Sequence, residues 1–248
     1  MLVSSALATH QHTSRSDRYG FIPTTELIAK LADHGWEVTG ASEARCRDKS
    51  RVGFNKHLLR FRNKSLPVVS DAVPELLLLN SHDGTSTYQM RAGFFRFACL
   101  NGLVVGEDIF PTFRVRHGKG ALTDVIEGTY EIIDRVPEIV GQIGDMRAIE
   151  LADSERLAFA RAALPLRFEH SPITEEQALR VHRSADTGHD LWTTFNVVQE
   201  NLIKGGLRGH DAQGHRRRTR AVNGIDGNVK LNSALWTLAE EMRKLKAA

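Results

Sequence analysis

Short runs of alternating apolar and polar residues occupy the part of the chain that follows residue 35. In residues 56–64 the alternation places Leu59 and Phe61 on one face of an extended strand and Arg60 and Arg62 on the other. Asp-Gly and Asn-Gly turn signals separate the later runs. The pattern predicts an antiparallel β-meander over residues 36–117, with further strands at 36–39, 75–80, 87–100, 103–105 and 113–116.

Apolar spacings of three and four residues frame this region on both sides. Thr24 to His34 reads as one helix before the strands. After Gly120 the same period predicts five helices, at 122–143, 149–164, 174–183, 191–203 and 232–245. A helix, then a meander, then several helices packed on the sheet is an α+β order rather than the alternating order of a parallel sheet.

The predicted organisation is a flexible N-terminal tail at 1–20 and a single α+β domain at 21–248. Within that domain, residues 36–117 are rich in strands and residues 122–248 are helical. A basic loop at 205–228 interrupts the helical part and leads into the last helix. Glycines beside the arginines of this loop predict flexible flanks.

Charge is segregated along the 248 residues, although the formal net charge is only +3. Residues 45–64 and 204–220 are strongly basic, whereas residues 124–155 are strongly acidic. This distribution predicts one basic and one acidic surface. The alternatives are that the runs are ordinary solvated faces, or that the arginines pair with the acidic stretch within or between chains.

The two cysteines, Cys46 and Cys99, lie in strand-like segments and have no metal-ligand spacing. Both fit a reducing cytosol without a disulfide scaffold. Cys46 is expected to be buried, with a thiol activated by the neighbouring Arg45 and Arg47 as the alternative. The N-terminal segment lacks the pattern of a signal peptide, and no stretch approaches the length of a membrane span. The sequence therefore predicts a cytoplasmic protein without a membrane partner.

No motif for an enzyme is complete, so neither a catalytic residue nor a cofactor is predicted. The spacing His10-x-His12 has no third ligand, and no metal site is expected there. Asp186, His189 and Asp190 could form a metal-dependent nuclease site, with solvated positions at helix ends as the alternative reading.

Arginines at strand spacing beside phenylalanines are typical of surfaces that bind single-stranded nucleic acid, where cations meet phosphates and rings meet bases. The alternative for Phe61, Phe94, Phe95 and Phe97 is plain sheet core. The candidate nucleic-acid-binding residues share a positive charge and fall in the two basic runs and the last strand: Arg45, Arg47, Lys56, Arg60, Arg62, Lys64, Arg114, Arg116, Lys204, Arg208, Arg216, Arg217, Arg218 and Arg220.

Four segments resemble a known family. They are AGFFRFACLNGLV at 92–104, FRVRH at 113–117, LWTTFNVVQENLIKGG at 191–206 and RRRTRAVNGID at 216–226. Together they are similar to the phage- and plasmid-like proteins of domain of unknown function 932. The resemblance implies a setting among prophages, plasmids and conjugative elements, beside anti-restriction and DNA-repair genes, but no activity.

A second resemblance concerns only the order of elements. A helix ending near Gly35-Trp36, strands to Val115 and a long helix from about 122 follow the order of single-strand annealing proteins, which form rings with DNA in a basic groove. The resulting hypothesis is a mobile-element protein that binds or anneals single-stranded DNA as a homo-oligomer, with a ring as one form. The alternatives are an anti-defence protein that binds a host nuclease or restriction complex, and the metal-dependent nuclease.

Overall fold

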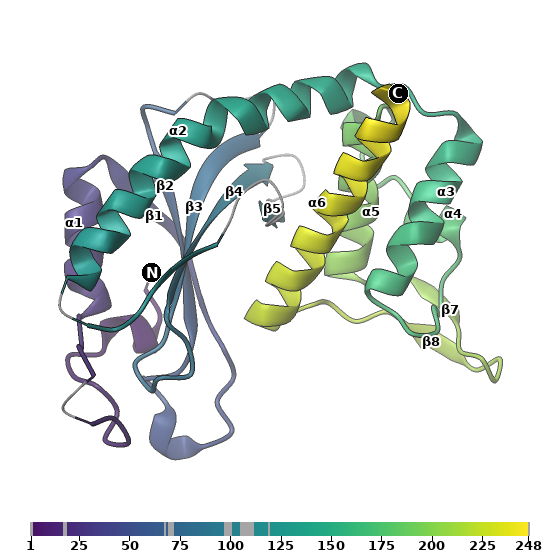
Figure 1. Ribbon diagram of the computed structural model, residues 1–248. Coiled ribbons are helices and arrows are strands. Elements are labelled where there is room, and N and C mark those ends of the chain that lie inside the picture. The colour runs from purple at the N-terminus through teal and green to yellow at the C-terminus, as the bar shows by residue number, and fades with distance from the viewer. Residues whose placement is uncertain are drawn as a thin grey trace. The chain divides into compact units, whose positions relative to one another are not determined.

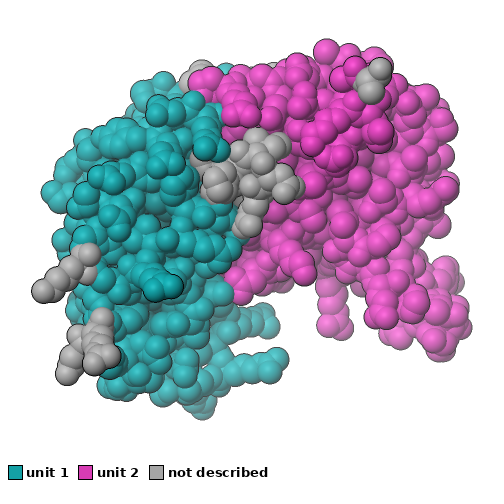
Figure 2. Space-filling model, viewed as in Figure 1, with its two compact units in different colours: residues 1–97, 109–136 teal, residues 98–108, 137–248 magenta. Residues whose placement is uncertain are grey.

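A computed structural model describes residues 2–16, 19–66, 68, 72–96, 101–104, 112–118 and 120–247, with only the backbone described for 101–104. The chain divides into two compact units (Figure 2). Unit 1 comprises residues 1–97 and 109–136, and unit 2 comprises residues 98–108 and 137–248. Antiparallel strands in unit 1 and helices in both units make the fold α+β, as the sequence predicts.

Unit 1 is built on an antiparallel sheet. Its strands β1 to β4 lie in sequence order, and β6 pairs with β4, so the predicted meander is confirmed (Figure 1). The elements of this unit are η1 (Ser4–Leu7), α1 (Thr24–Asp33), β1 (Trp36–Glu43), η2 (Lys49–Arg51), β2 (His57–Asn63), β3 (Ala72–Asn80), β4 (Tyr88–Arg96), β6 (Phe113–Val115) and the first part of α2 (Ala121–Ala148).

The predicted alternation holds along β2, where buried and half-buried residues follow each other without interruption. Leu59 and Phe61 are fully buried on the face that forms the core. The first part of α2 packs close to β4. As a result, a side chain on Gly128 would clash with the terminal methyl group of Met90. The alternation of apolar and polar side chains along the strands therefore determines which face of the sheet is apolar and is covered by helices.

The N-terminal residues 2–16 are packed, in contrast to the predicted flexible tail. The hydroxyl groups of Ser4 and Ser5 donate to Glu43 at 3.0 and 2.9 Å. The rings of His10 and His12 lie edge-on to Phe54, with centroids 5.2 and 5.4 Å away. The serines and histidines that make this segment look like a polar tail are the groups that attach it.

Unit 2 is helical apart from short strands. Its elements are β5 (Asn101–Val104), the last part of α2, α3 (Asp153–Ala163), η3 (Leu164–Leu166), α4 (Glu175–Ala178), η4 (Ser184–Asp186), α5 (Leu191–Lys204), β7 (Arg208–His210), β8 (Arg216–Arg218) and α6 (Ile225–Ala247). The rings of Trp192, Phe195 and Trp236 meet between α5 and α6, with centroids 5.7 to 6.4 Å apart. This unit therefore has an aromatic core of its own.

The single domain predicted from residue 21 onward stays a prediction beside the division into two compact units. Other predictions differ from the structure. The helix predicted at 174–183 is a single turn, α4. Cys46 lies in the loop after β1, half-buried, with its Sγ 3.0 Å from the carbonyl oxygen of Asp48. Cys99 lies outside the described residues.

The length and the hydropathy of a helix decide whether it can cross a membrane. Among the described residues, none of the helices combines the length and the hydropathy that crossing a membrane requires.

Candidate nucleic-acid interface

The arginine-rich stretch that follows α5 is a β-hairpin, whereas the sequence predicts a loop. Helix α5 ends at Lys204, and Gly205 (φ 64°) and Gly206 (φ 86°) turn the backbone through a region that favours glycine. A side chain at Gly205 would lie 2.6 Å from the backbone of Arg220. The two glycines therefore bring both ends of the hairpin together at the end of the helix.

The hairpin places two arginines directly opposite each other across its two strands. Arg208 lies opposite Arg218, Gly209 opposite Arg217, and His210 opposite Arg216. Hydrogen bonds continue the pairing beyond the strands, from the amide of Gly206 to the carbonyl of Thr219 at 2.8 Å. Like charges directly opposite each other destabilise a strand pair, so an anion on this face would relieve the repulsion.

One carboxylate organises the turn. Oδ1 of Asp211 accepts the backbone N–H groups of Gln213 and His215, and Oδ2 accepts Nε of Arg217 at 2.8 Å. Burial opposes ionisation of Asp211, but these hydrogen bonds outweigh it and hold the pKa of its carboxyl below the usual value. The partner of Arg217 is therefore inside the hairpin rather than in the acidic stretch 124–155.

Three contacts attach the hairpin to α4 and to the segment before it. The amide of His210 donates to the carbonyl oxygen of Pro172 at 2.9 Å. Nε2 of Gln177 donates to the carbonyl oxygen of Arg208 at 2.8 Å, while its Oε1 receives the amide of Thr174 in a capping box. At Gly209 the backbones approach so closely that a side chain would clash with Pro172. The arginines thus stand on a fixed support.

A groove of about 840 Å³ lies between this support and the hairpin. Its lining residues come from both sides, namely Ser171, Pro172, Ile173, Thr174, Gln177, Arg208, Gly209, His210, Arg216, Arg217 and Arg218. A second hollow of about 460 Å³ shares Gln177, Arg208 and Arg218 with the groove and adds Arg180, Gly206 and Leu207. Neither lining contains a carboxylate.

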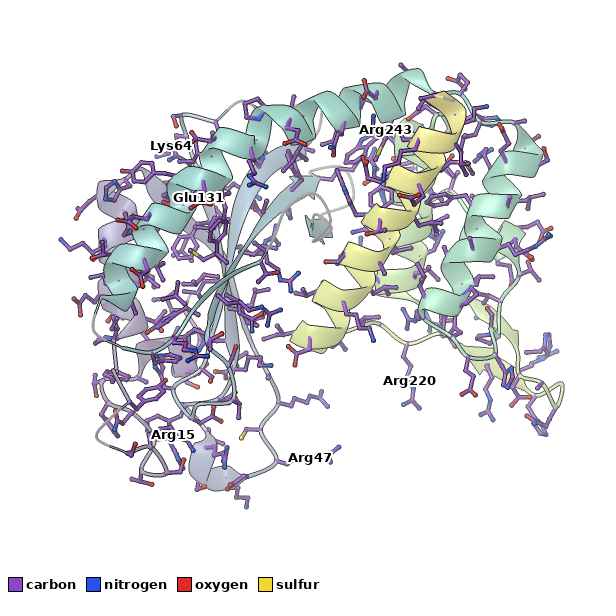
Figure 3. All side chains as sticks on the ribbon, in the orientation of Figure 1. Arg15, Arg47, Lys64, Glu131, Arg220 and Arg243 are labelled. Atoms are coloured by element: carbon purple, nitrogen blue, oxygen red, sulfur yellow. The ribbon has the colours of Figure 1, made fainter. Side chains whose placement is uncertain are left out.

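Most guanidinium groups of this surface are free to meet a ligand. Nε of Arg218 donates to the carbonyl oxygen of Gly206 at 3.1 Å, which leaves its other N–H groups available. For Arg208, Arg216 and Arg220, the described part of the chain supplies no hydrogen bond or ion pair to the guanidinium. Figure 3 shows the side chain of Arg220 extending away from the ribbon. The structure thus brings Arg208, Arg216, Arg217 and Arg218 together.

Two residues of unit 2 modify the predicted set. Lys204 has a carboxylate within reach, since its Nζ lies 2.9 Å from Oε1 of Glu200. Arg180 lines the second hollow, although the sequence reading did not include it. Arg180 lies outside the two dense basic runs of the sequence, so charge density could not identify it.

The predicted arginines of β2 lie in a different environment. Nε of Arg60 and Nε of Arg62 bind the two oxygens of Glu75 at 2.7 and 2.8 Å. Both guanidinium groups lie over the ring of Phe95, 4.5 and 4.4 Å from its centroid. Phe61 and Phe94 are buried in the sheet core, and Phe97 lies outside the described residues. Glu75 therefore already binds N–H groups of both arginines, and Phe95 covers the planar face of both guanidinium groups. A strand of nucleic acid would need these same contacts.

The other predicted cations of unit 1 are dispersed. Arg45 and Arg47 are exposed in the loop after β1, and Arg114 and Arg116 are exposed in or just after β6. Lys56 is half-buried, and Nζ of Lys64 lies 2.6 Å from Oε1 of Glu37. None of these side chains lines the groove beside the hairpin.

Helix α5 has the structural role that its apolar stripe predicts, with Trp192, Phe195, Val198 and Leu202 all buried. The polar residues of the same helix bind protein groups. Asn196 donates to the carbonyl oxygen of Trp192, Gln199 donates to Asn232, and Glu200 binds Arg183 and Lys204. These groups hold unit 2 together rather than meeting a ligand.

The residues of the alternative metal site have other partners. Asp190 caps α5 by accepting the amide of Thr193 at 2.8 Å, and buried Asp186 binds Arg183. His189 lies 3.7 Å from Asp153. In the described ranges, no three His, Cys, Asp or Glu side chains are grouped so that they could hold a metal ion.

Comparisons with known proteins place the chain in a family. Residues 11–236 match the family described as "Domain of unknown function (DUF932)". The chain belongs to the DUF932 family. Two Escherichia coli proteins, "UPF0380 protein YafZ" and "UPF0380 protein YfjQ", are each 46% identical over 243 residues, which cover 97% of this chain and 88% of theirs. No solved structure matches. The family resemblance of the four motifs is confirmed, and the similarity to annealing proteins stays a prediction.

Proposed function

We propose that this DUF932 protein binds nucleic acid, with single-stranded DNA as the preferred ligand, in the groove beside the β7–β8 hairpin. The observation that carries the proposal is the cross-strand placement of Arg208, Arg216 and Arg218 on a rigid support, without a carboxylate in the groove. Phosphates are the anions whose spacing along a strand suits a row of guanidinium groups. We further propose that the protein is a cytoplasmic homo-oligomer and that it anneals the strands that it binds.

Titration of labelled single-stranded and double-stranded oligonucleotides at two salt concentrations tests this function. The variant R208A/R216A/R218A should bind more weakly and should lose about 0.7 units of salt slope for each phosphate contact on a single strand. Its melting temperature should change little, because the removed groups are exposed. Complementary oligonucleotides in the same titration report annealing, and light scattering reports the assembly.

A charge-matched control is available. K30A/R161A/K244A removes three exposed cations that are already paired with Asp33, Glu175 and Glu241. If this control weakens binding as much as the hairpin variant does, the effect is one of net charge and the groove is not the site. No binding of either oligonucleotide at low salt would overturn the function.

The acidic stripe of α2 supports a second candidate, binding of a host nuclease or restriction complex. Within unit 1, its exposed carboxylates follow one side of the helix, at Asp124, Glu127, Glu131 and Asp134. A basic DNA-binding surface is the kind of partner that such a stripe attracts. Capture from a nuclease-treated host lysate should then succeed with the native chain and fail with E127Q/E131Q/D134N. Capture that disappears after nuclease treatment favours DNA instead.

A further inference from the structure

The second hollow beside the hairpin differs from the main groove in the way that charge is placed around it. Its lining residues are Gln177, Arg180, Gly206, Leu207, Arg208 and Arg218. Three of the six residues are arginines, which come from the segment just after α4 and from both strands of the hairpin. Arginines are thus directed to one small volume from three points of the chain.

The other polar groups of this hollow are already occupied. The side-chain amide of Gln177 bonds Arg208 and Thr174, and the amide of Gly206 donates to the carbonyl of Thr219. The guanidinium of Arg218 lies over Gly206, held by Nε, and keeps its remaining N–H groups. For Arg180 and Arg208, the described residues supply no bond to the guanidinium. Arginine N–H groups are therefore the donors that remain for a ligand.

We infer that this hollow binds the terminal phosphate of a nucleic-acid strand, an inference that rests on the proposed function. A phosphodiester inside a strand has one negative charge and two free oxygens. A terminal phosphate carries a charge of about −1.5 to −2 at neutral pH and offers three acceptor oxygens. Three guanidinium groups around one volume match the terminal group in both charge and number of acceptors.

Continuity with the groove identifies the source of that phosphate. Gln177, Arg208 and Arg218 line both spaces, so the hollow adjoins the groove. The end of a strand bound in the groove can therefore reach the hollow. A free nucleotide would offer the same phosphate chemistry without using the groove. The protein therefore recognises strand ends, and the phosphorylation state of an end controls its affinity.

The experiment compares one single-stranded oligonucleotide in three forms, with a 5′-phosphate, a 3′-phosphate and hydroxyl groups at both ends. One phosphorylated form should bind about tenfold more tightly than the hydroxyl form, the effect of one added charge-assisted hydrogen bond. R180A should remove this preference, because it should weaken binding of the phosphorylated form more than binding of the hydroxyl form. R180K should restore part of the preference, because it keeps the charge but not the planar fork. K230A, which removes an exposed cation of α6, should retain the preference in full.

Three results would overturn the inference. Equal affinity for all three forms removes the end-binding role and leaves the proposed function intact. A preference that survives in R180A places the terminal phosphate elsewhere. Displacement of the phosphorylated oligonucleotide by a nucleoside monophosphate at equal concentration makes the hollow a site for a small molecule. Absence of binding to every form is a different failure, since it removes the proposed function together with the inference.

Discussion

Strand β2 and strand β8 both carry arginines at strand spacing, but only β2 has a buried carboxylate to receive them. In β2, Arg60 and Arg62 bind Glu75, whose side chain is 1% exposed, and both cover Phe95. In the hairpin, Arg208 faces Arg218 and the groove contains no acidic residue. The same residue type therefore stabilises the sheet in one region and remains available to an anion in the other. Neighbours across the strands decide the difference.

The largest expected effect comes from removing the carboxylate of β3. E75A leaves two guanidinium groups, each about one-quarter exposed, beside an apolar ring without a counter-ion. Breaking such a pair from one side should lower the free energy of unfolding by about 3 kcal/mol. Denaturant unfolding measures this loss.

The matched control for that measurement is E37A. Glu37 is exposed and binds exposed Lys64, so its loss should cost less than about 1 kcal/mol. If E75A is as mild as E37A, the β2 arginines are well solvated and the contrast between the two strands fails. A gain in DNA affinity on E75A would return these arginines to the candidate site.

Acid should act on unit 1 through its buried histidines. Burial is the main cause that lowers the pKa of His57 to about 4 and that of His82 to about 3, and Thr24 Oγ1 lies 3.1 and 2.9 Å from their rings. The pKa of each is near 6.5 in the unfolded chain. As the pH falls below that value, only the unfolded chain takes up these protons, so stability is complete above pH 6.5 and is lost below it. The loss should reach roughly 2 kcal/mol for each histidine near pH 5.

Hydrogen exchange at neutral and acidic pH, corrected for intrinsic rates, locates the effect. Protection of β2 and β3 should fall in acid. The hairpin should change less, because His57 and His82 both belong to unit 1 and the hairpin belongs to unit 2. A uniform loss across both units would mean that another group controls acid stability, and a smaller pH dependence in H82Q would identify His82 as a contributor.

Attachment of the hairpin can be tested without touching an arginine. In G209A the added methyl group clashes with the carbonyl oxygen of Pro172, so the strand must move away from its support. Inserting a methyl group into such a contact costs about 1–3 kcal/mol. If DNA binding requires the hairpin to return to its support and half of that cost opposes binding, DNA affinity should fall by roughly two- to tenfold. G224A is the control, since no atom lies near its added methyl group. Unchanged DNA affinity in G209A would show that the arginines act without the support.

Features that depend on local period could be predicted from the sequence. The alternating faces of β2 and the apolar stripe of α5 both match the structure, because each is read within a few residues of one element. The ion pair between Arg62 and Glu75 depends on the register of two strands and gives no local signal. The hairpin strands have three residues each, too few for alternation to be visible. The contact of Gly209 with Pro172, like the place of Arg180, arises only when distant segments fold together.

The smallest expected effect concerns the one carboxylate of the hairpin. D211N removes the charge that binds Arg217 but keeps an oxygen that can accept the amides of Gln213 and His215, so the turn should persist. Exposed pairs are worth about 0.2–1 kcal/mol, and single-stranded DNA should therefore bind about two- to fivefold more tightly at low salt. At high salt the gain should vanish, because screening removes the interaction of the exposed charges. The control, E241Q, removes the same charge from α6, where Glu241 pairs with Lys244, and should leave affinity unchanged. Weaker binding by D211N would instead mean that Asp211 orients Arg217 toward the strand, and the hairpin would then resemble β2 in depending on its carboxylate.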